Sequence, residues 1–184
     1  MNYNLILVRF GELTIKGRNR RRFESLMFTN IKQALASFSK LEFERSYGRL
    51  FIHLNGENFD AVSERLSEIF GLSSFSPVVR AENKVEAIQD AALQVMRGLE
   101  RTPKTFKVTV RRTWKDFPHD SQQMNHLVGA HVLRNTPDLK VDVRNPEIEL
   151  KVDIQAEATF VYCRVIPGAG GFPIGMNGKA MLLL

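Results

Sequence analysis

The order of the apolar segments in the first half of the chain restricts its fold more than any other feature. Residues 4–10 form a nearly continuous apolar run, which predicts a buried strand. Apolar side chains within residues 23–38 instead recur every three or four positions, which predicts a helix. Residues 41–44 and 50–54 then predict two strands that are joined by a turn at residues 47–49.

A second helix and a further strand follow. Asn58 is suited to cap the helix start, Phe70 is expected on its apolar face, and Gly71 is suited to stop it. Residues 75–80 predict the next strand. The resulting order, strand–helix–strand–strand–helix–strand, is that of the ferredoxin-like fold. We therefore predict an α+β protein whose first domain, with this βαββαβ order, covers residues 1–75.

The middle of the chain predicts a second small domain. Asn83 and Glu86 mark a helix start that resembles a capping box. Residues 104–111 alternate between apolar and polar side chains, as in a strand with one buried face. The remaining predicted elements are a helix at residues 121–134 and strands at residues 148–154 and 158–165. Together they predict an α/β domain that covers residues 76–166.

The tail has a different composition. Residues 167–175 contain too much glycine and proline for a helix or a strand and are predicted to form a linker. Residues 179–184 begin with a lysine and continue as an apolar run, as a central parallel strand begins. Because such a strand would be exposed if nothing followed it, we expect residues 167–184 to be a linker and the first strand of a truncated third domain.

The charge balance favours a polyanionic partner. The chain carries 26 Lys and Arg residues against 20 Asp and Glu, a formal net charge of +6, and nucleic acid is the commonest partner of basic proteins. No apolar run approaches the ~20 residues of a membrane span, and the start lacks a signal peptide, so we expect a cytoplasmic protein. The single cysteine, Cys163, excludes an intrachain disulfide and is expected to be a small buried side chain.

One group of cations lies at the predicted start of the first helix. Cations at a helix N-terminus are unfavourable by roughly 0.3–1 kcal/mol each, so their presence there favours a bound anion, such as a phosphate of RNA. The alternative is a solvated arginine-rich surface. The residues of this group are Lys16, Arg18, Arg20, Arg21 and Arg22.

A second group of cations begins at Arg101 and continues through the predicted strand at residues 104–111 to Lys115. Trp114 and Phe117 lie beside it in the sequence, and cations next to aromatic rings suit RNA, although Trp114 is at least as well explained as a core or edge residue. With two further arginines, the candidate RNA-binding residues here are Lys104, Lys107, Arg111, Arg112, Lys115, Arg134 and Arg144.

The sequence lacks complete motifs for nucleotide binding, catalysis or metal binding. Gly178-Lys179 lacks the glycine and the hydroxyl residue that a Walker A loop requires, and Gly168-Ala169-Gly170 lacks the third glycine of a dinucleotide fingerprint. None of the four histidines has the spacing of a zinc site, and His131 is expected to be a satisfied core side chain. The residues therefore predict a binding protein with no catalytic or metal site.

Two stretches resemble a known family. One reads Arg9-Phe10-Gly11-Glu12-Leu13-Thr14-Ile15-Lys16-Gly17-Arg18-Asn19-Arg20, followed by Phe23, and it resembles the opening of the bacterial tRNA 4-thiouridine sulfurtransferases. These enzymes also take part in thiamine biosynthesis. The other stretch, residues 167–175, looks like their linker to the catalytic domain. The resemblance implies a ferredoxin-like domain, then a THUMP domain, a module of several RNA-modifying enzymes, and then an adenylating PP-loop domain that is absent here.

The resemblance also implies a division of labour. In the family, ATP with Mg²⁺ activates the uridine at position eight of tRNA, and a persulfide sulfur supplied by a cysteine desulfurase displaces AMP. The first two domains hold the acceptor arm and its 3′ end, so this chain is expected to bind tRNA and to contribute no catalytic residue or cofactor. The backbone of Leu183 and Leu184 would lie at the adenine side of the ATP site of the whole enzyme. The resemblance leaves a homodimer open.

Two other readings stay open. The chain can be the THUMP module of a different RNA-modifying enzyme, such as a methylase, or a stand-alone RNA-binding adaptor. The Gly11-Glu12 and Lys16-Gly17 motif argues against the methylase, because it is typical of the first domain of the sulfurtransferases. The apolar end of the chain argues against the adaptor.

Overall fold

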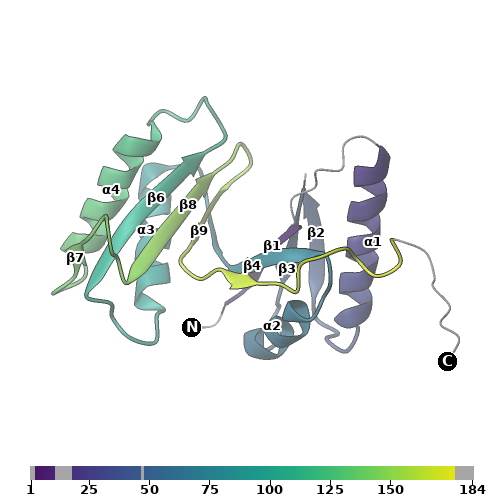
Figure 1. The fold of residues 1–184 in the computed structure, drawn as a ribbon. Helices are drawn as coiled ribbons and strands as arrows, with labels where there is room; N and C mark the ends of the chain where they lie inside the picture. Colours follow the sequence, from purple (N-terminus) through teal and green to yellow (C-terminus); the bar gives the residue numbers. More distant parts are fainter. Residues whose placement is uncertain (1–2, 11–17, 47, 177–184) are drawn as a thin grey trace, which may run out of the picture. The chain divides into compact units, whose positions relative to one another are not determined.

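The computed structural model describes residues 3–10, 18–46 and 48–176, although not the side chains of residues 18–20. The described residues form two compact units (Figure 1). One unit contains residues 3–77 together with residues 165–176, and the other contains residues 78–164. The chain thus leaves the first unit, builds the second and returns to the first.

The first unit has the predicted ferredoxin-like topology. Its antiparallel sheet has the strand order β10-β4-β1-β3-β2. The inner order, β4-β1-β3-β2, is the one that a βαββαβ chain adopts in this fold, so the predicted class is confirmed. The elements are β1 Leu5–Phe10, α1 Arg18–Ala34, β2 Glu42–Ser46, β3 Arg49–His53, α2 Phe59–Ser67, β4 Leu72–Pro77 and β10 Ile166–Pro167.

Alternation along the strands explains the core of this unit. Ile6 and Val8 of β1 pair with Ile52 and Leu50 of β3, and all four are fully buried. Both helices cover this face, α1 with Met27, Ile31 and other apolar side chains at helical spacing, and α2 with Val62 and Leu66. Burial of each such side chain contributes roughly 1.5–3 kcal/mol, so this helix–sheet layer is the main source of stability.

The start of α2 follows the prediction, whereas its end does not. The Asn58 Oδ1 accepts a hydrogen bond from the Ala61 N–H at 2.9 Å, which confirms the predicted cap. The helix ends at Ser67, and Gly71 adopts a positive φ of 91° only at the entry to β4. Phe70 therefore lies outside the helix with 51% of its surface exposed, and its predicted place on the apolar face is wrong.

Residues 165–176 pack along the first unit. The Gly168 and Gly170 N–H groups donate to the Ser73 and Leu72 carbonyls, both at 2.9 Å, so the chain continues past β10 beside β4. Asn30 of α1 donates from Nδ2 to the Ile174 carbonyl at 3.1 Å. The prediction that residues 167–175 contain no strand is wrong at Pro167, which belongs to β10. The strand forms because these residues pair with β4, a distant partner that a glycine-rich local sequence does not predict.

Alanine at position 168 is expected to loosen this segment. A Cβ atom there would collide with the backbone and side chain of Leu72, so the β10–β4 pair must separate or shift. We expect the Gly168→Ala variant to lose about 1–3 kcal/mol of unfolding free energy in urea titrations. The neighbouring Ala169→Ser change, at an exposed residue, is the control. Equal stability of the two variants would contradict the close packing.

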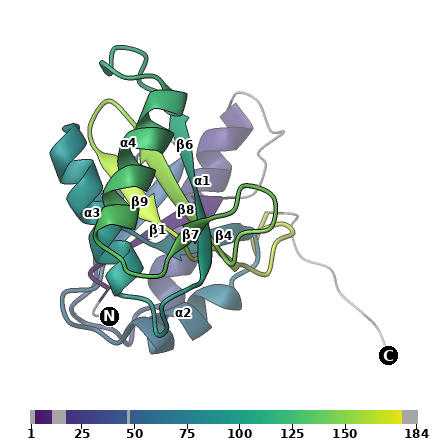
Figure 2. The ribbon, with the colours of Figure 1, turned by 90° about the vertical axis from the view of Figure 1, so that its left-hand side faces the viewer.

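The second unit is a mixed sheet with two helices on one face (Figure 2). Its strand order is β5-β9-β8-β6-β7, in which β6 runs parallel to β7 and β8 while β8, β9 and β5 are antiparallel neighbours. The elements are β5 Val79–Ala81, α3 Val85–Arg97, β6 Thr105–Arg112, α4 Ser121–Arg134, β7 Lys140–Val141, β8 Ile148–Ile154 and β9 Thr159–Tyr162.

The predicted alternation of the second unit is confirmed. Phe106 and Val110 of β6, with Leu150, Val152 and Ile154 of β8, are buried in one core with residues of α3 and α4. The intervening residues of both strands therefore point to the opposite face of the sheet, because successive side chains of a strand alternate between its faces. This opposite face carries most of the charged residues of β6 and β8.

Two local predictions are wrong at the edges of this unit. The single strand expected over residues 75–80 is two strands, because β4 ends at Pro77 and β5 belongs to the other sheet. Asn83 caps no helix: its Nδ2 donates to the Gln155 carbonyl at 2.7 Å, and its Oδ1 accepts from the Thr159 hydroxyl at 2.7 Å. Those partners are more than seventy residues away, which local sequence patterns do not reveal.

Other element ends also differ from the predictions. The first helix ends at Ala34, before the predicted end of its apolar repeat, and the strand expected over residues 158–165 covers only Thr159–Tyr162. A complete capping box occurs at α4, where Asp120 accepts from the Gln123 N–H and the Gln123 side chain accepts from the Asp120 N–H. Such a box stabilises a helix start by satisfying two otherwise unpaired donors.

Candidate nucleic-acid interface

The open face of the second unit, the sheet face opposite α3 and α4, carries lysines and two carboxylates, Glu149 and the buried Asp153. Lys107 and Lys151 place their Nζ atoms 3.4 Å from the two carboxylate oxygens of Glu149. The Thr109 hydroxyl donates to the Glu149 Oε1 at 2.6 Å, and this bond, with the two lysines, lowers the pKa of Glu149. Two lysines therefore share one of these carboxylates.

The side chains of Arg111 and Arg112 point to opposite faces of the sheet and have different contacts. Arg111 is exposed and shares the open face with Lys107, because the two are four residues apart on one strand. Arg112 points the other way, and its Nη1 donates to the carbonyls of Lys115 at 3.1 Å and Phe117 at 3.0 Å. Arg112 thus holds the loop after β6 in place, while Lys115 is exposed on that loop.

The other candidate cations of this unit lie at the opposite end of β6. Lys104 precedes the strand and Arg111 is near its end, a separation of about 23 Å for seven steps along a strand. Arg144 lies in the loop that contacts the start of β6 through the Glu147 N–H and the Thr105 hydroxyl. Arg134, at the end of α4, donates to the Ala130 carbonyl of its own helix. Lys104, Arg134 and Arg144 are all exposed.

The aromatic residues beside the basic cluster face the core. Phe117 is 3% exposed, and Trp114 is half-buried against the same core with its ring centroid 6.0 Å from that of Phe117. Phe117 therefore cannot stack on a base without leaving the core. This arrangement favours the core or edge interpretation of Trp114.

The first predicted cluster is described only in part. Arg21 and Arg22 are exposed in α1, and no acidic residue occupies the first turn of this helix. Arg18 and Arg20 belong to α1, but their side chains lie outside the described part of the structure, as do Lys16, Leu183 and Leu184. The anion site expected at the helix start therefore stays a prediction.

A groove that the sequence did not indicate runs between α4 and β6. It has a volume of about 490 Å³, a floor that includes Val108, Gly129 and Leu133, and a rim that includes Lys107 and His126. It exists because β7 pairs with only two residues of β6 and leaves the rest of that edge uncovered. Asn125 satisfies part of the edge, since its Oδ1 accepts from the Val110 N–H at 2.9 Å.

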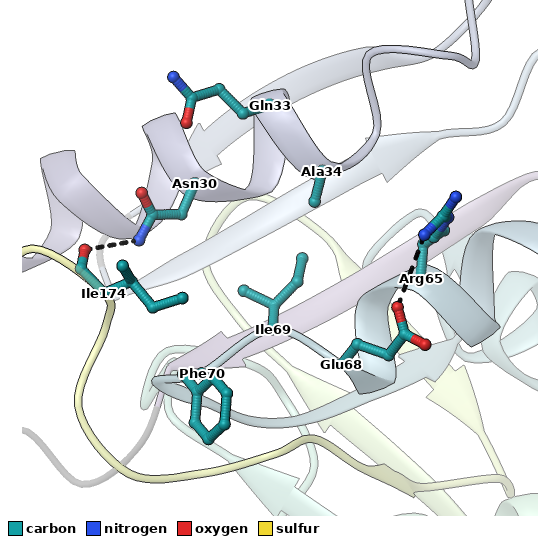
Figure 3. A pocket seen from close by; sticks show the side chains of 8 residues that line it. All are labelled: Asn30, Gln33, Ala34, Arg65, Glu68, Ile69, Phe70 and Ile174. Atoms are coloured by element: carbon teal, nitrogen blue, oxygen red, sulfur yellow. Dashed lines mark hydrogen bonds and ion pairs between the residues drawn. The ribbon is translucent and has the colours of Figure 1, made fainter. Parts of the chain in front are cut away.

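A second groove lies in the first unit, between α1, α2 and the residues that follow β10 (Figure 3). Its volume is about 350 Å³, and Ile69, Phe70 and Ile174 make it largely apolar. The cation at its rim, Arg65, forms an ion pair with Glu68 at 3.7 Å. This groove therefore adds no unpaired cation to the basic surfaces.

Cys163 and His131 are both partly buried in the second unit. Burial raises the pKa of the Cys163 thiol, which packs beside the core of the second unit. The Nε2 of His131 is buried without a hydrogen bond and lies 3.9 Å from a carboxylate oxygen of Asp90, so the expectation that His131 is satisfied is wrong at this nitrogen. Among the described residues, no group of three or more His, Cys, Asp or Glu side chains could hold a metal ion.

None of the helices described here is both long and apolar enough to span a bilayer.

Comparison with known proteins identifies both units. Residues 5–76 match the model of the ThiI ferredoxin-like domain, and residues 82–164 match the model of the THUMP domain. The full chain is 42% identical to the probable tRNA sulfurtransferase of Brevibacillus brevis and 45% identical to that of Geobacillus kaustophilus. It covers 46% of each of these proteins, so the chain spans about half the length of the curated relatives that it matches.

A solved structure gives the same result. A 4-thiouridine synthetase in complex with RNA and ATP superposes on 99% of this chain with a TM-score of 0.86 and 29% identity, and the matched part is 46% of that protein. Fold and comparisons together define a protein that joins a ferredoxin-like domain to a THUMP domain. The chain belongs to the ThiI ferredoxin-like and THUMP domain families, and over its full length it is similar to tRNA sulfurtransferases, as the sequence motifs predicted.

Proposed function

We propose that this chain is the tRNA-binding part of a tRNA uracil 4-sulfurtransferase, the enzyme that makes 4-thiouridine at position eight of tRNA. The observation that carries the proposal is the likeness, over nearly the whole chain, to a 4-thiouridine synthetase whose solved structure contains RNA. The relatives are about twice as long, and we assign the chemical steps to the part of those proteins that this chain does not match.

The basic residues supply the physical basis for tRNA binding. Lys107 and Arg111 offer charge along the open face of the second unit, Lys115 extends it at one end, and Lys104, Arg134 and Arg144 offer cations at the other. Lysines and arginines that neutralise phosphates release counterions, and this release supplies much of the affinity. Lys16, Arg18, Arg20, Arg21 and Arg22 at the first helix complete the proposed set. Arg112 contributes by positioning the loop that carries Lys115.

ATP and Mg²⁺ belong to the remainder of the proposed enzyme. The described residues offer neither a phosphate-binding loop of the Walker type nor a cluster of metal ligands, so they do not fit either group. We derive no step through ATP from this chain. The adenine contact assigned to Leu183 and Leu184 and the supply of sulfur by a cysteine desulfurase remain parts of the proposal, as do a homodimer, a cytoplasmic location and a role in thiamine biosynthesis.

A different THUMP protein is the competing function. Methylases and stand-alone adaptors can carry a THUMP domain, and the match to the second unit alone would not separate them. The match of residues 5–76 to the ThiI ferredoxin-like domain favours the sulfurtransferase.

Binding of tRNA fragments tests the proposed docking role. A minihelix that contains only the acceptor and T arms should bind this chain nearly as tightly as whole tRNA. An anticodon arm should bind at least about tenfold more weakly, since specific contacts exceed the non-specific attraction of phosphates. Fluorescence anisotropy with labelled RNAs measures both affinities. Equal binding of the two arms would contradict docking through the acceptor arm, and an absence of binding to whole tRNA would contradict the function itself.

A further inference from the structure

The first unit contains a basic cavity that the sequence did not indicate. Its volume is about 220 Å³, and it lies where α1 passes the hairpin of β2 and β3. Three arginines from three elements line it: Arg21 from α1, Arg45 from β2 and Arg49 from β3. Glu24 also lines the cavity. Arg49 precedes the core residue Leu50 in β3, so strand alternation turns its side chain toward the opposite face of the sheet.

Arg45 is exposed, and it lies at the edge of the sheet face that the helices cover. Arg45 lies opposite Leu50, and Phe43, two residues before it, lies opposite Ile52; both of these β3 residues are fully buried. The side chain of Arg45 is therefore on the face of the sheet that the helices cover, at its rim, where an apolar residue would extend the core. The guanidinium thus stands beside α1 and remains accessible to solvent.

Aromatic contacts hold the cations at this place. The guanidinium carbon of Arg45 is 3.4 Å from the centroid of the Phe28 ring, and the Nζ of Lys32 is 5.4 Å from the same centroid. Phe28 packs against the core of the unit, so its ring is a fixed support. Arg21, Ser25, Phe28 and Lys32 follow one another at helical spacing along one side of α1. Each cation–π contact contributes about 0.5–1 kcal/mol at an exposed site.

The lining offers one carboxylate, from Glu24, beside the guanidinium groups of Arg21 and Arg45. Arg21 and Lys32 are exposed on α1, and Arg45 reaches the same side of that helix from β2. A phosphate offers oxygens that arginine can bind through two parallel N–H donors, and the Ser25 hydroxyl in the lining can donate a further hydrogen bond. The fixed Phe28–Arg45 stack lowers the entropy that Arg45 would lose on binding.

We propose that this cavity binds a phosphodiester group of RNA through Arg21 and Arg45. The inference rests on the proposed tRNA-binding function and adds Arg45 of β2 to the cations proposed for the first unit. Of these residues, only Arg21 belongs to the basic clusters of the sequence. Arg21 and Arg45 are distant in the sequence, and only the packing of α1 against the sheet brings them to one cavity.

Substitution of Arg45 tests the site. Arg45→Met removes the charge and keeps an apolar chain over Phe28, whereas Arg45→Lys keeps the charge without the two-donor geometry. We expect Arg45→Met to weaken tRNA binding about tenfold, as loss of a charged hydrogen bond does, and to lower the salt slope by about 0.7–0.9. Arg45→Lys should retain the slope with part of the affinity. Ethylation interference should lose the signal of one phosphate in Arg45→Met, and Arg21→Met should lose the same one.

Arg65→Met is the matched control. Arg65 is an exposed arginine of α2 in the same unit, and its loss changes the net charge by the same amount. If Arg45→Met and Arg65→Met bind tRNA equally well while the unsubstituted chain shows salt-dependent binding, the cavity is not a phosphate site and the proposed function stands. If the unsubstituted chain does not bind tRNA, both the function and the site are wrong. Thermal melting of each variant separates loss of binding from loss of folding.

Discussion

Raising the salt concentration from 50 to 200 mM is expected to weaken the binding of tRNA to this chain about a hundredfold. The candidate cations are distributed over both units, and we assume that about four of them meet phosphates at one time. Each neutralised phosphate changes the logarithm of the affinity by about 0.7–0.9 per tenfold change in salt. Filter binding or anisotropy at four or five salt concentrations gives the slope, and the slope gives the number of phosphates.

The control for this experiment separates ion release from general solvent effects. Sucrose at matched osmolality does not displace the protein from phosphates and should leave the affinity unchanged. A change of less than about threefold between the two salt concentrations would mean that fewer than two phosphates are neutralised. That result would contradict binding through the basic surfaces described here.

The Arg111→Ala variant is expected to lose tRNA affinity, whereas the Arg112→Ala variant is expected to lose stability. Arg111 is exposed on the open face, so Arg111→Ala should weaken tRNA binding several-fold and lower the salt slope by about 0.7–0.9 without loss of stability. Arg112 donates to two backbone carbonyls and is half-buried, so Arg112→Ala should cost about 1–3 kcal/mol of unfolding free energy. Urea titration and anisotropy on both variants measure the two effects.

The two substitutions control for each other, because both remove one arginine from the same strand. Arg97→Ala, at an exposed position in the last turn of α3, controls for the loss of charge elsewhere in the unit. The assignment of Arg112 to the loop is wrong if Arg112→Ala is as stable as Arg111→Ala. The assignment of Arg111 to the RNA is wrong if Arg111→Ala and Arg97→Ala bind tRNA with the same affinity and the same salt slope.

The sequence alone determined the features that depend on near neighbours. Periodicity over a few residues predicted the helices and most of the strands, because a side chain's face follows from its spacing along one element. Asn58 was predicted as a cap because its bond to Ala61 spans only three residues. The order of the elements in turn predicted the ferredoxin-like topology of the first unit, because few sheet arrangements suit a βαββαβ chain.

Only the tertiary structure decided the features that depend on distant partners. Residues 75–80 have the sequence pattern of one strand. In the structure, the residues up to Pro77 belong to β4 in one sheet, and those from Val79 belong to β5 in the other. Arg111 and Arg112 look equivalent in a basic run, but strand alternation and the loop carbonyls give them separate roles. Arg21 and Arg45 show no relation in the sequence and line one cavity in the fold. Hydrogen bonds between remote segments, and the grouping of their charged side chains, depend on which surfaces pack together. The packing of the whole core determines which surfaces these are, and no local sequence pattern does.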